Sequence, residues 1–357
     1  KSPLFPYPRS SDLEKFRACL SENIPNFGNS AVRTFFEDES GTLWVGTKGS
    51  GIYNFTRDPT IKALTLSNRF NMESGLLSNS VYKIAKGFKN EYWIGTDGSG
   101  INYYDKKTKN IRSLNMPDNL TLSSVYAILP DDDDILWVGT SGYGMYKLKI
   151  DLSTTPYRVA DYKQFIFNEE KSSLSNNIVY SIIKEDSAHL WIGTRGGGIN
   201  RFNIIDETFQ IFKFSGESYG SNDVLCMHKD NKGSLWVGTS MGLIKLTWRN
   251  REQPAVINFN EKNGMPNNTI HGILEDKNNN LWVSTNHGLA KLIPDETKED
   301  SYRIISYFAN DGLQDNEFSD GSYYSSPYSS LFYFGGISGF KEFNPLEIIQ
   351  NEYMLGL

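Results

Sequence analysis

The sequence predicts an all-β fold, a closed seven-bladed β-propeller of four-stranded antiparallel blades, and three observations lead to this prediction. The first is a phrase that recurs through the chain: a Trp among apolar residues, followed by Gly and Thr. Copies with little change lie at residues 43–47, 92–96, 136–140, 190–194, 235–239 and 281–285, and a worn seventh copy, with Tyr333 for Trp, at 332–336. Successive copies are 44 to 54 residues apart, a period typical of a propeller blade.

The second observation is the pattern within one repeat. The fourth repeat reads as strands at residues 178–184, 190–194, 199–203 and 209–214, with a polar turn after the first strand and a Gly-rich turn after the second. The strand that carries Trp191 is apolar at consecutive positions, which predicts burial on both faces between two neighbouring blades. We expect Trp191 to fill the space between blades and Gly193 to let the neighbouring blade approach. No helical periodicity is convincing, apart from an ambiguous run around residues 12–20.

The third observation concerns closure of the ring. The last repeat ends near residues 340–343, at a third strand with no fourth strand after it. The segment Phe16–Leu20 has no other place to pair, so we expect it to complete the seventh blade and leave no open edge. The predicted propeller therefore spans residues 13–345, with a linker or tail at 1–12 and a linker into a following domain at 346–357.

Composition excludes several classes of protein. The chain has 357 residues, a formal charge of −6 and a pI of about 5.4, without a basic stripe, so nucleic acid is not an expected partner. It has no run of 18 apolar residues, so we expect no direct membrane contact. The start, Lys1-Ser2-Pro3, is not a signal peptide and is typical of the interior of a longer protein. Cys19 and Cys226 fall in distant parts of the ring; two free thiols weakly favour a reducing compartment, but an exported protein with buried cysteines is also compatible with them.

The sequence shows no catalytic constellation, metal site or cofactor motif. The four His residues (His189, His228, His271 and His287) lack metal-ligand spacing. The run Asp131–Asp134 lacks the alternating ligands of a calcium loop and is interpreted as a solvated turn, as are Asp230–Gly233 and Asp276–Asn280. The Gly-rich run at 195–198 joins two strands and opens no helix, so it does not predict a phosphate site. An enzyme is therefore not predicted.

A binding face is predicted more clearly. In a propeller, the turns between second and third strands share one face with the loops that lead into the first strands. At one equivalent position near the start of the first strands, the sequence places Arg33, Tyr82, Tyr126, Tyr180, Leu225, His271 and Ser319. The framework repeats while these positions vary, as in a scaffold that carries an asymmetric site. The candidate ligand-binding residues of this face are Arg33, Lys48, Tyr82, Asp97, Tyr126, Tyr143, Tyr180, Arg195, His271, Asn286 and His287.

Side chains of these types suit a sugar. Aromatic rings stack on the C–H faces of a sugar, while Asn and Arg bind its hydroxyl and acidic groups. The alternative for each single residue is structural: the Asn residues shape turns and the Tyr residues pack between blades.

The repeats resemble those of the two-component regulator propeller family. The family pattern, roughly Asn-x-Val-x-x-Ile-x-x-Asp-x-x-Gly-x-Leu-Trp-Ile-Gly-Thr-x-Gly-Gly-Gly-Leu, is matched at 222–242 and 268–288. The phrase Asp311-Gly312-Leu313 and the ending Phe343-Asn344-Pro345 are also typical of it. The resemblance covers about residues 13–345 and departs at Ser284 and in the worn last blade.

This resemblance implies a periplasmic sensor region of a hybrid two-component system, often from gut Bacteroidetes. In that family two propellers typically precede an immunoglobulin-like domain, a membrane span, a histidine kinase, a receiver and a DNA-binding module. The sensor recognises an oligosaccharide released from a polysaccharide. Kinase motifs are absent here, so the chain would be one propeller whose partners are the oligosaccharide, a sister propeller and the immunoglobulin-like domain; a homodimer is compatible with this.

Two other functions stay open at this point. One is a propeller enzyme of the polysaccharide- or antibiotic-lyase type, which would require an acid/base pair on one face; the aligned repeats show none that is convincing. The other is a protein-docking scaffold, as in many intracellular propellers. Loops rich in Tyr and Asn on an acidic chain favour the sugar.

Overall fold

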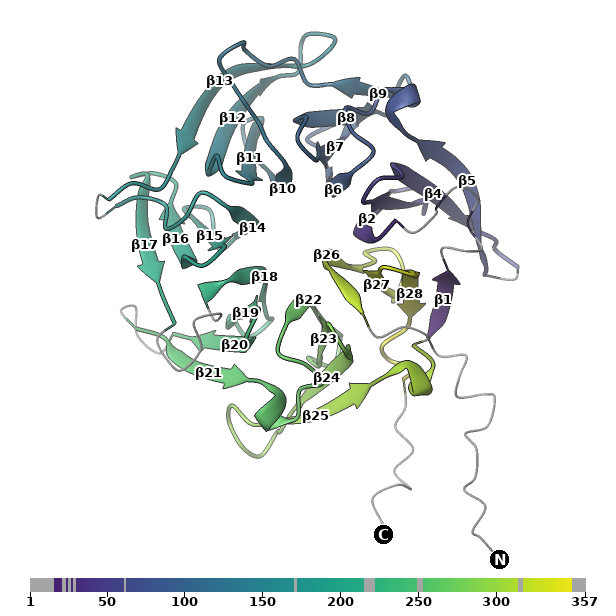
Figure 1. Cartoon of the computed structure of the whole chain (residues 1–357), viewed down its shortest axis with the longest axis vertical. Helices are drawn as coiled ribbons and strands as arrows, with labels where there is room; N and C mark the ends of the chain where they lie inside the picture. The colour runs from purple at the N-terminus through teal and green to yellow at the C-terminus, as the bar shows by residue number, and fades with distance from the viewer. Residues whose placement is uncertain are drawn as a thin grey trace, which may run out of the picture.

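The computed structural model describes residues 16–20, 24, 27, 30–60, 62–169, 172–214, 222–248, 253–313 and 317–348, which form seven four-stranded antiparallel sheets arranged in a ring (Figure 1). The predicted seven-bladed propeller is confirmed. The first three blades are β2 (Val32–Glu37), β3 (Leu43–Thr47), β4 (Ile52–Arg57) and β5 (Leu64–Phe70); β6 (Val81–Lys86), β7 (Glu91–Thr96), β8 (Ile101–Asp105) and β9 (Asn110–Ser113); and β10 (Val125–Asp131), β11 (Ile135–Thr140), β12 (Met145–Asp151) and β13 (Arg158–Phe165). The next three are β14 (Val179–Lys184), β15 (His189–Thr194), β16 (Gly198–Asn203) and β17 (Thr208–Phe212); β18 (Val224–Lys229), β19 (Leu235–Thr239), β20 (Gly242–Thr247) and β21 (Ala255–Phe259); and β22 (Ile270–Glu275), β23 (Leu281–Thr285), β24 (Gly288–Pro294) and β25 (Tyr302–Tyr307).

The seventh blade joins the two ends of the chain. Its strands are β26 (Phe318–Ser325), β27 (Phe332–Gly336), β28 (Gly339–Phe343) and, as the outermost strand, β1 (Arg17–Leu20). Strand β1 pairs antiparallel with β28, and the two lie side by side in Figure 1. The ring of Phe16 packs against Phe343 and Tyr307, with centroids 4.9 and 5.4 Å away. The predicted closure by Phe16–Leu20 is therefore confirmed. The proposed tail at 1–12 and residues 349–357 lie outside the described part of the chain.

In the strands that carry the repeated Trp, the Trp phrase itself is buried at every position, as the unbroken apolar pattern predicted. Trp191 is 2% exposed and belongs to a cluster with Val224, Leu235 and Leu246 of the next blade, so it does pack between blades. A Cβ atom on Gly193 would lie 2.6 Å from Cγ1 of Val224. Only glycine therefore permits the observed spacing between these two blades.

Four of the Trp side chains are held by an Asp six residues earlier in the chain. The indole Nε1 donates to a carboxylate oxygen in Trp44–Asp38 (3.0 Å), Trp137–Asp131 (3.0 Å), Trp236–Asp230 (2.8 Å) and Trp282–Asp276 (2.9 Å). In the second blade Gly87 occupies the Asp position, and Nε1 of Trp93 has no hydrogen-bond partner among the described residues. The turn interpretation of Asp131, Asp230 and Asp276 was thus incomplete, because each also satisfies a buried donor.

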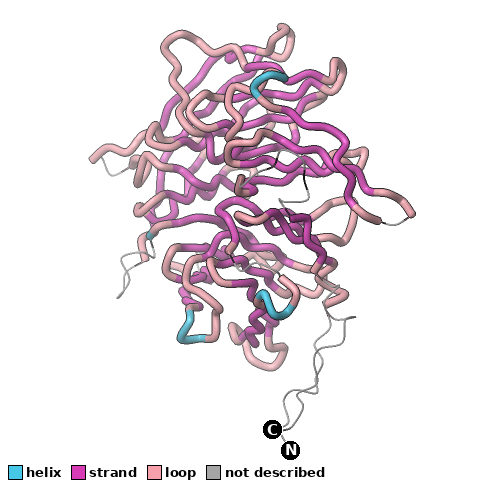
Figure 2. Tube along the Cα trace, turned by 45° about the vertical axis from the view of Figure 1, so that its right-hand side comes forward, coloured by secondary structure: helices cyan, strands magenta, loops and turns pink. Residues whose placement is uncertain are grey.

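Short 3-10 turns lead into three of the innermost strands. They are η2 (Met72–Ser74), η4 (Glu261–Asn263) and η5 (Ala309–Asp311), drawn in cyan in Figure 2. Each turn is followed by a glycine with a left-handed backbone (φ 98 to 104°) and then by a buried apolar residue, Leu76, Met265 or Leu313. The phrase Asp311-Gly312-Leu313 of the sequence is therefore part of one of these caps, which anchor the loops that lead into the innermost strands. The part of the chain that the structure describes contains no helix that could span a membrane.

Candidate functional site

The innermost strands of six blades each contain a β-bulge next to their first residue. In β2, Val32 is opposite Thr47 and Thr34 is opposite Gly46, which leaves Arg33 as the extra residue. The same register shift leaves one extra residue in β6, β10, β14, β18 and β22: Tyr82, Tyr126, Tyr180, Leu225 and His271. A bulge bends the strand and redirects a side chain away from the regular pleat. The equivalent position identified in the sequence is therefore the bulge.

These bulges surround a pocket at the centre of the ring, where the innermost strands converge in Figure 1. This cavity, the mouth pocket, has a volume of about 220 Å³. It is lined by Arg33, Lys48, Tyr82, Tyr126, Tyr180, Leu225, Asp320 and Gly321. Five of the predicted site residues line it: Arg33, Lys48, Tyr82, Tyr126 and Tyr180. Side chains from six different blades meet there, which explains why no local sequence motif marks the site.

The three tyrosines form a continuous aromatic arc. The rings of Tyr82 and Tyr126 meet edge to face with centroids 5.0 Å apart, and Tyr126 and Tyr180 are 5.1 Å apart. The guanidinium carbon of Arg33 lies 5.8 Å from the centroid of Tyr82. Burial, together with the charge of Asp97, raises the pKa of Tyr82 to about 12, and burial also raises the pKa of Tyr180. Both phenols are therefore neutral near pH 7 and can donate hydrogen bonds.

The seventh blade departs from the pattern. The register between β26 and β27 moves from Phe318 directly to Tyr323, so a longer bulge replaces the single extra residue. Ser319, expected at the equivalent position, is buried, and Asp320 lines the pocket in its place. The left-handed Gly321 (φ 72°) belongs to the same bulge. The prediction that Ser319 is the equivalent residue of the seventh blade was wrong, because this degenerate repeat has additional residues in its bulge.

Asp320 is the centre of a polar cluster on one side of the pocket. Its Oδ1 is 2.5 Å from Nδ1 of His271, whose Nε2 is 2.6 Å from Oδ1 of Asn286. Its Oδ2 is 4.0 Å from a terminal nitrogen of Arg33. Burial alone would raise the pKa of Asp320, but the hydrogen bond to His271 and the charges of His271 and Arg33 outweigh it and lower the pKa. Two predicted residues, His271 and Asn286, are thus joined to the pocket through a residue that was not predicted.

The remaining predicted residues lie around the pocket without lining it. Asp97 accepts a hydrogen bond from the hydroxyl of Tyr82 at 3.3 Å and another from Ser124. Arg195 is exposed on the same face, and its charge acts on Tyr180 and on Asp223. Burial raises the pKa of Asp223, a further acidic group that sequence reasoning missed.

Two predicted residues are farther out on this face. Tyr143 is 43% exposed in the turn between β11 and β12 and does not contribute to the pocket. His287 is exposed, with its ring 5.4 Å from that of Phe308. The structure therefore brings a subset of the candidate face together at its centre and leaves these two at its periphery.

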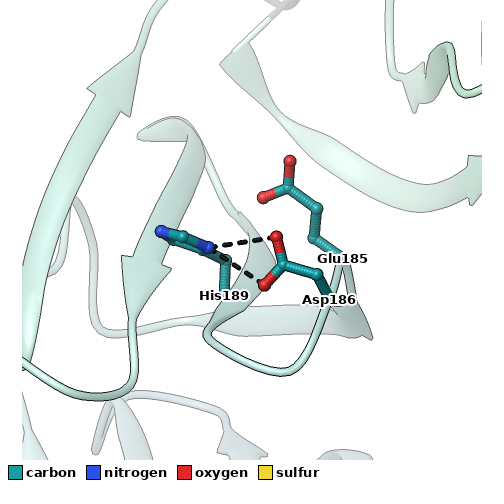
Figure 3. A group of neighbouring side chains, drawn as sticks. All are labelled: Glu185, Asp186 and His189. Atoms are coloured by element: carbon teal, nitrogen blue, oxygen red, sulfur yellow. Dashed lines mark hydrogen bonds and ion pairs between the residues drawn. The ribbon is translucent and has the colours of Figure 1, made fainter. Parts of the chain in front are cut away.

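A second group of titratable side chains lies in the β14–β15 turn, at the opposite end of the strands. Glu185, Asp186 and His189 are close enough to share a cation (Figure 3). Nδ1 of His189 is 3.0 and 3.2 Å from the two carboxylate oxygens of Asp186, while Arg201 Nε donates to Glu185 at 2.6 Å. Each carboxylate already has a protein partner, so ion pairing accounts for this cluster.

Comparison with known proteins agrees with the repeat pattern. Four segments, 26–49, 119–142, 218–241 and 264–287, match the family model described as two component regulator propeller. A protein described as histidine kinase P4 from Formosa agariphila is 30% identical over 336 residues. That alignment covers 91% of this chain but only 23% of the relative, so the chain spans about a quarter of that protein.

Solved structures show the same architecture. The extracellular domain of a putative hybrid two component system from B. thetaiotaomicron is 27% identical, with a TM-score of 0.72, over 93% of this chain and 41% of that chain. A second such extracellular domain from the same organism is 22% identical, with a TM-score of 0.71, over 92% of this chain and 42% of the other. A streptogramin B lyase structure is 13% identical, with a TM-score of 0.63, over 92% of this chain and 97% of the other, and shares the fold alone.

Proposed function

The chain belongs to the two-component regulator propeller family, and from this premise we propose that it is a ligand-sensing extracytoplasmic domain of a hybrid two-component signalling protein. In this proposal the mouth pocket binds an oligosaccharide from polysaccharide breakdown, and occupancy is relayed to a kinase. The likeness to extracellular domains of hybrid two-component systems supports a sensor role and an extracytoplasmic place, which we propose is the periplasm.

The observation that carries the ligand proposal is the composition of the pocket. Three tyrosines form an arc with Arg33 at one end. His271 is hydrogen-bonded both to Asp320, which lines the pocket, and to Asn286. Aromatic faces bind the C–H surface of a sugar, and the convergent polar groups can bind its hydroxyls. The surrounding framework repeats from blade to blade, whereas these side chains differ, as expected where an asymmetric ligand is read.

The relay of occupancy requires partners beyond this chain. A closed ring of seven buried interfaces is rigid, so we propose that the ligand repositions the propeller against a neighbouring unit: a sister propeller, an immunoglobulin-like domain or a second copy. Such a mechanism needs the ligand to bind the two arrangements with different affinity.

Isothermal titration calorimetry with a panel of oligosaccharide fragments tests the ligand proposal. We expect one class of fragment to bind with a dissociation constant in the micromolar range, which corresponds to about 7–9 kcal/mol. Tyr126→Ala should abolish the heat, because Tyr126 is the middle ring of the arc, whereas Tyr328→Ala, an exposed tyrosine outside the pocket, should not. Absence of binding by every fragment, or equal binding by both variants, would refute the ligand site.

A propeller enzyme is the second candidate, and the close pair of His271 and Asp320 beside the pocket favours it. A base paired with a carboxylate is a common arrangement for proton abstraction. Mass spectrometry of the bound fragment after prolonged incubation separates the two functions. A sensor leaves the fragment intact, whereas a lyase or hydrolase converts it into smaller products that are lost in His271→Gln.

A further inference from the structure

The lining of the mouth pocket contains more cationic than anionic side chains. The lining contains two cations, both from the first blade, Arg33 on β2 and Lys48 directly after β3. Its carboxylate, Asp320, lies 4.0 Å from Arg33 but is hydrogen-bonded to His271 at 2.5 Å. The acid of the pocket is thus mainly engaged by a third residue.

The two cations have donor capacity to spare. Nε of Arg33 is buried without a hydrogen-bond partner among the described residues, and its side chain contacts the face of Tyr82. Lys48 is exposed, and its ammonium forms no ion pair within the described part of the chain. A guanidinium offers five donors in a planar fork that matches a carboxylate or a sulfate, and the terminal nitrogens of Arg33 are the donors available for such a group.

The size of the pocket limits what can enter. Its volume of about 220 Å³ is below the roughly 300–1,000 Å³ of pockets that enclose a drug-sized ligand. One sugar ring fits this space better than a long fragment. The other rings of a longer oligosaccharide would lie outside the pocket, on the same face of the propeller, beside Arg195 and Tyr143.

We propose that the mouth pocket captures the acidic terminal ring of an oligosaccharide, with its anionic group over Arg33 and Lys48 and its C–H face on the tyrosine arc. This inference rests on the function proposed above and adds the chemical class of the ligand. The anionic group is a carboxylate or a sulfate ester, which share the same charge and acceptor oxygens.

Calorimetry with matched pairs of oligosaccharides tests the inference. One pair is a fragment with a terminal uronate and its carboxyl-reduced form; the other is a terminally sulfated fragment and its desulfated form. We expect one acidic member to bind at least tenfold more tightly than its neutral form, and the pair that discriminates identifies the anionic group. Raising the salt concentration should reduce the preference, because partly exposed charges are screened.

Variants assign the preference to the two cations. Arg33→Gln should remove it, Lys48→Gln should reduce it, and Arg33→Lys should retain part of it. Lys107→Gln, at an exposed lysine in the turn between β8 and β9, is the matched control and should leave it unchanged. Thermal melts of each variant verify that the ring is folded.

The outcomes separate the two levels of the proposal. Equal affinity for acidic and neutral members, with binding still lost in Tyr126→Ala, overturns the acidic-ring inference and leaves the sugar site intact. An acidic preference that persists in Arg33→Gln also overturns it. Failure of every member to bind overturns both the inference and the proposed sugar site.

Discussion

Nδ1 of His271 and Oδ1 of Asp320 lie 2.5 Å apart, although 49 residues separate them in the chain. The contact joins β22 of the sixth blade to the enlarged bulge of β26 in the seventh blade. It places a negative charge at the edge of the mouth pocket and holds it close to Arg33. The polarity of the pocket thus depends on a junction between blades.

Asp320→Asn should lower the free energy of unfolding near pH 7 by about 1 kcal/mol or less, since the side chain is half-exposed and solvent screens its charge. The folded-state pKa of Asp320 is lowered, so its charge stabilises the fold above the unfolded-state pKa of about 3.9 and this contribution disappears as the pH falls through the folded-state pKa. Urea denaturation of both proteins at several pH values measures the difference. A gap that widens below pH 4 would contradict this sign.

Trp191→Ala should destabilise the propeller by about 3–5 kcal/mol, as is general for large buried aromatic residues. The reason is its position between the fourth and fifth blades. Its ring centroid lies 5.1 Å from that of Trp248, and the guanidinium of Arg201 lies over its ring. Chemical denaturation measures the loss. The exposed Tyr328→Ala is a suitable control, and a loss below about 1 kcal/mol for Trp191→Ala would mean that the indole does not support the interface.

Deletion of residues 1–22 should lower the melting temperature and promote aggregation, because it removes β1 and leaves β28 as an open edge. The deletion also removes Phe16 from its contacts with Tyr307 and Phe343. Differential scanning calorimetry and light scattering measure both effects. Deletion of residues 1–12 alone, the expected tail, should have little effect; a 1–22 deletion that stays monomeric with an unchanged melting temperature would refute closure by this strand.

Arg195→Ala should weaken binding of the oligosaccharide while changing stability by no more than about 0.5 kcal/mol, as is usual for exposed positions. Arg195 lies at the rim, so its effect should be smaller than that of the pocket residue Tyr126. Calorimetric titration together with urea denaturation provides both numbers. Full affinity in the Arg195 variant would exclude this part of the face from the ligand site.

The fold could be predicted from the sequence because each blade repeats the same physical problem. A strand buried on both faces needs continuous apolar residues and a small residue where the next blade approaches. This residue is glycine in six of the seven blades and Ser284 in the sixth. The closing strand could also be predicted, because a last blade with only three strands requires a fourth strand from another part of the chain.

Only part of the candidate site could be predicted from the sequence. The repeat alignment identified the bulge residue in six blades, among them Tyr82, Tyr126 and Tyr180, because their register is the same. It missed Asp320, since the seventh blade has a longer bulge that a repeat alignment cannot place. It also could not pair His271 with Asp320, because that contact depends on the angle between two blades. An Asp lies six residues before the Trp in four repeats. Asp131, Asp230 and Asp276 were interpreted only as turn residues, and no role was predicted for Asp38.

The most direct test of the proposed sugar site is a crystal structure of this chain with the fragment that binds best in the calorimetric panel. We predict density for one sugar ring in the mouth pocket, stacked on Tyr82 or Tyr126 and within hydrogen-bond distance of Arg33. Density at the opposite end of the strands, beside Glu185 and His189, or at the outer edge of the blades would contradict it.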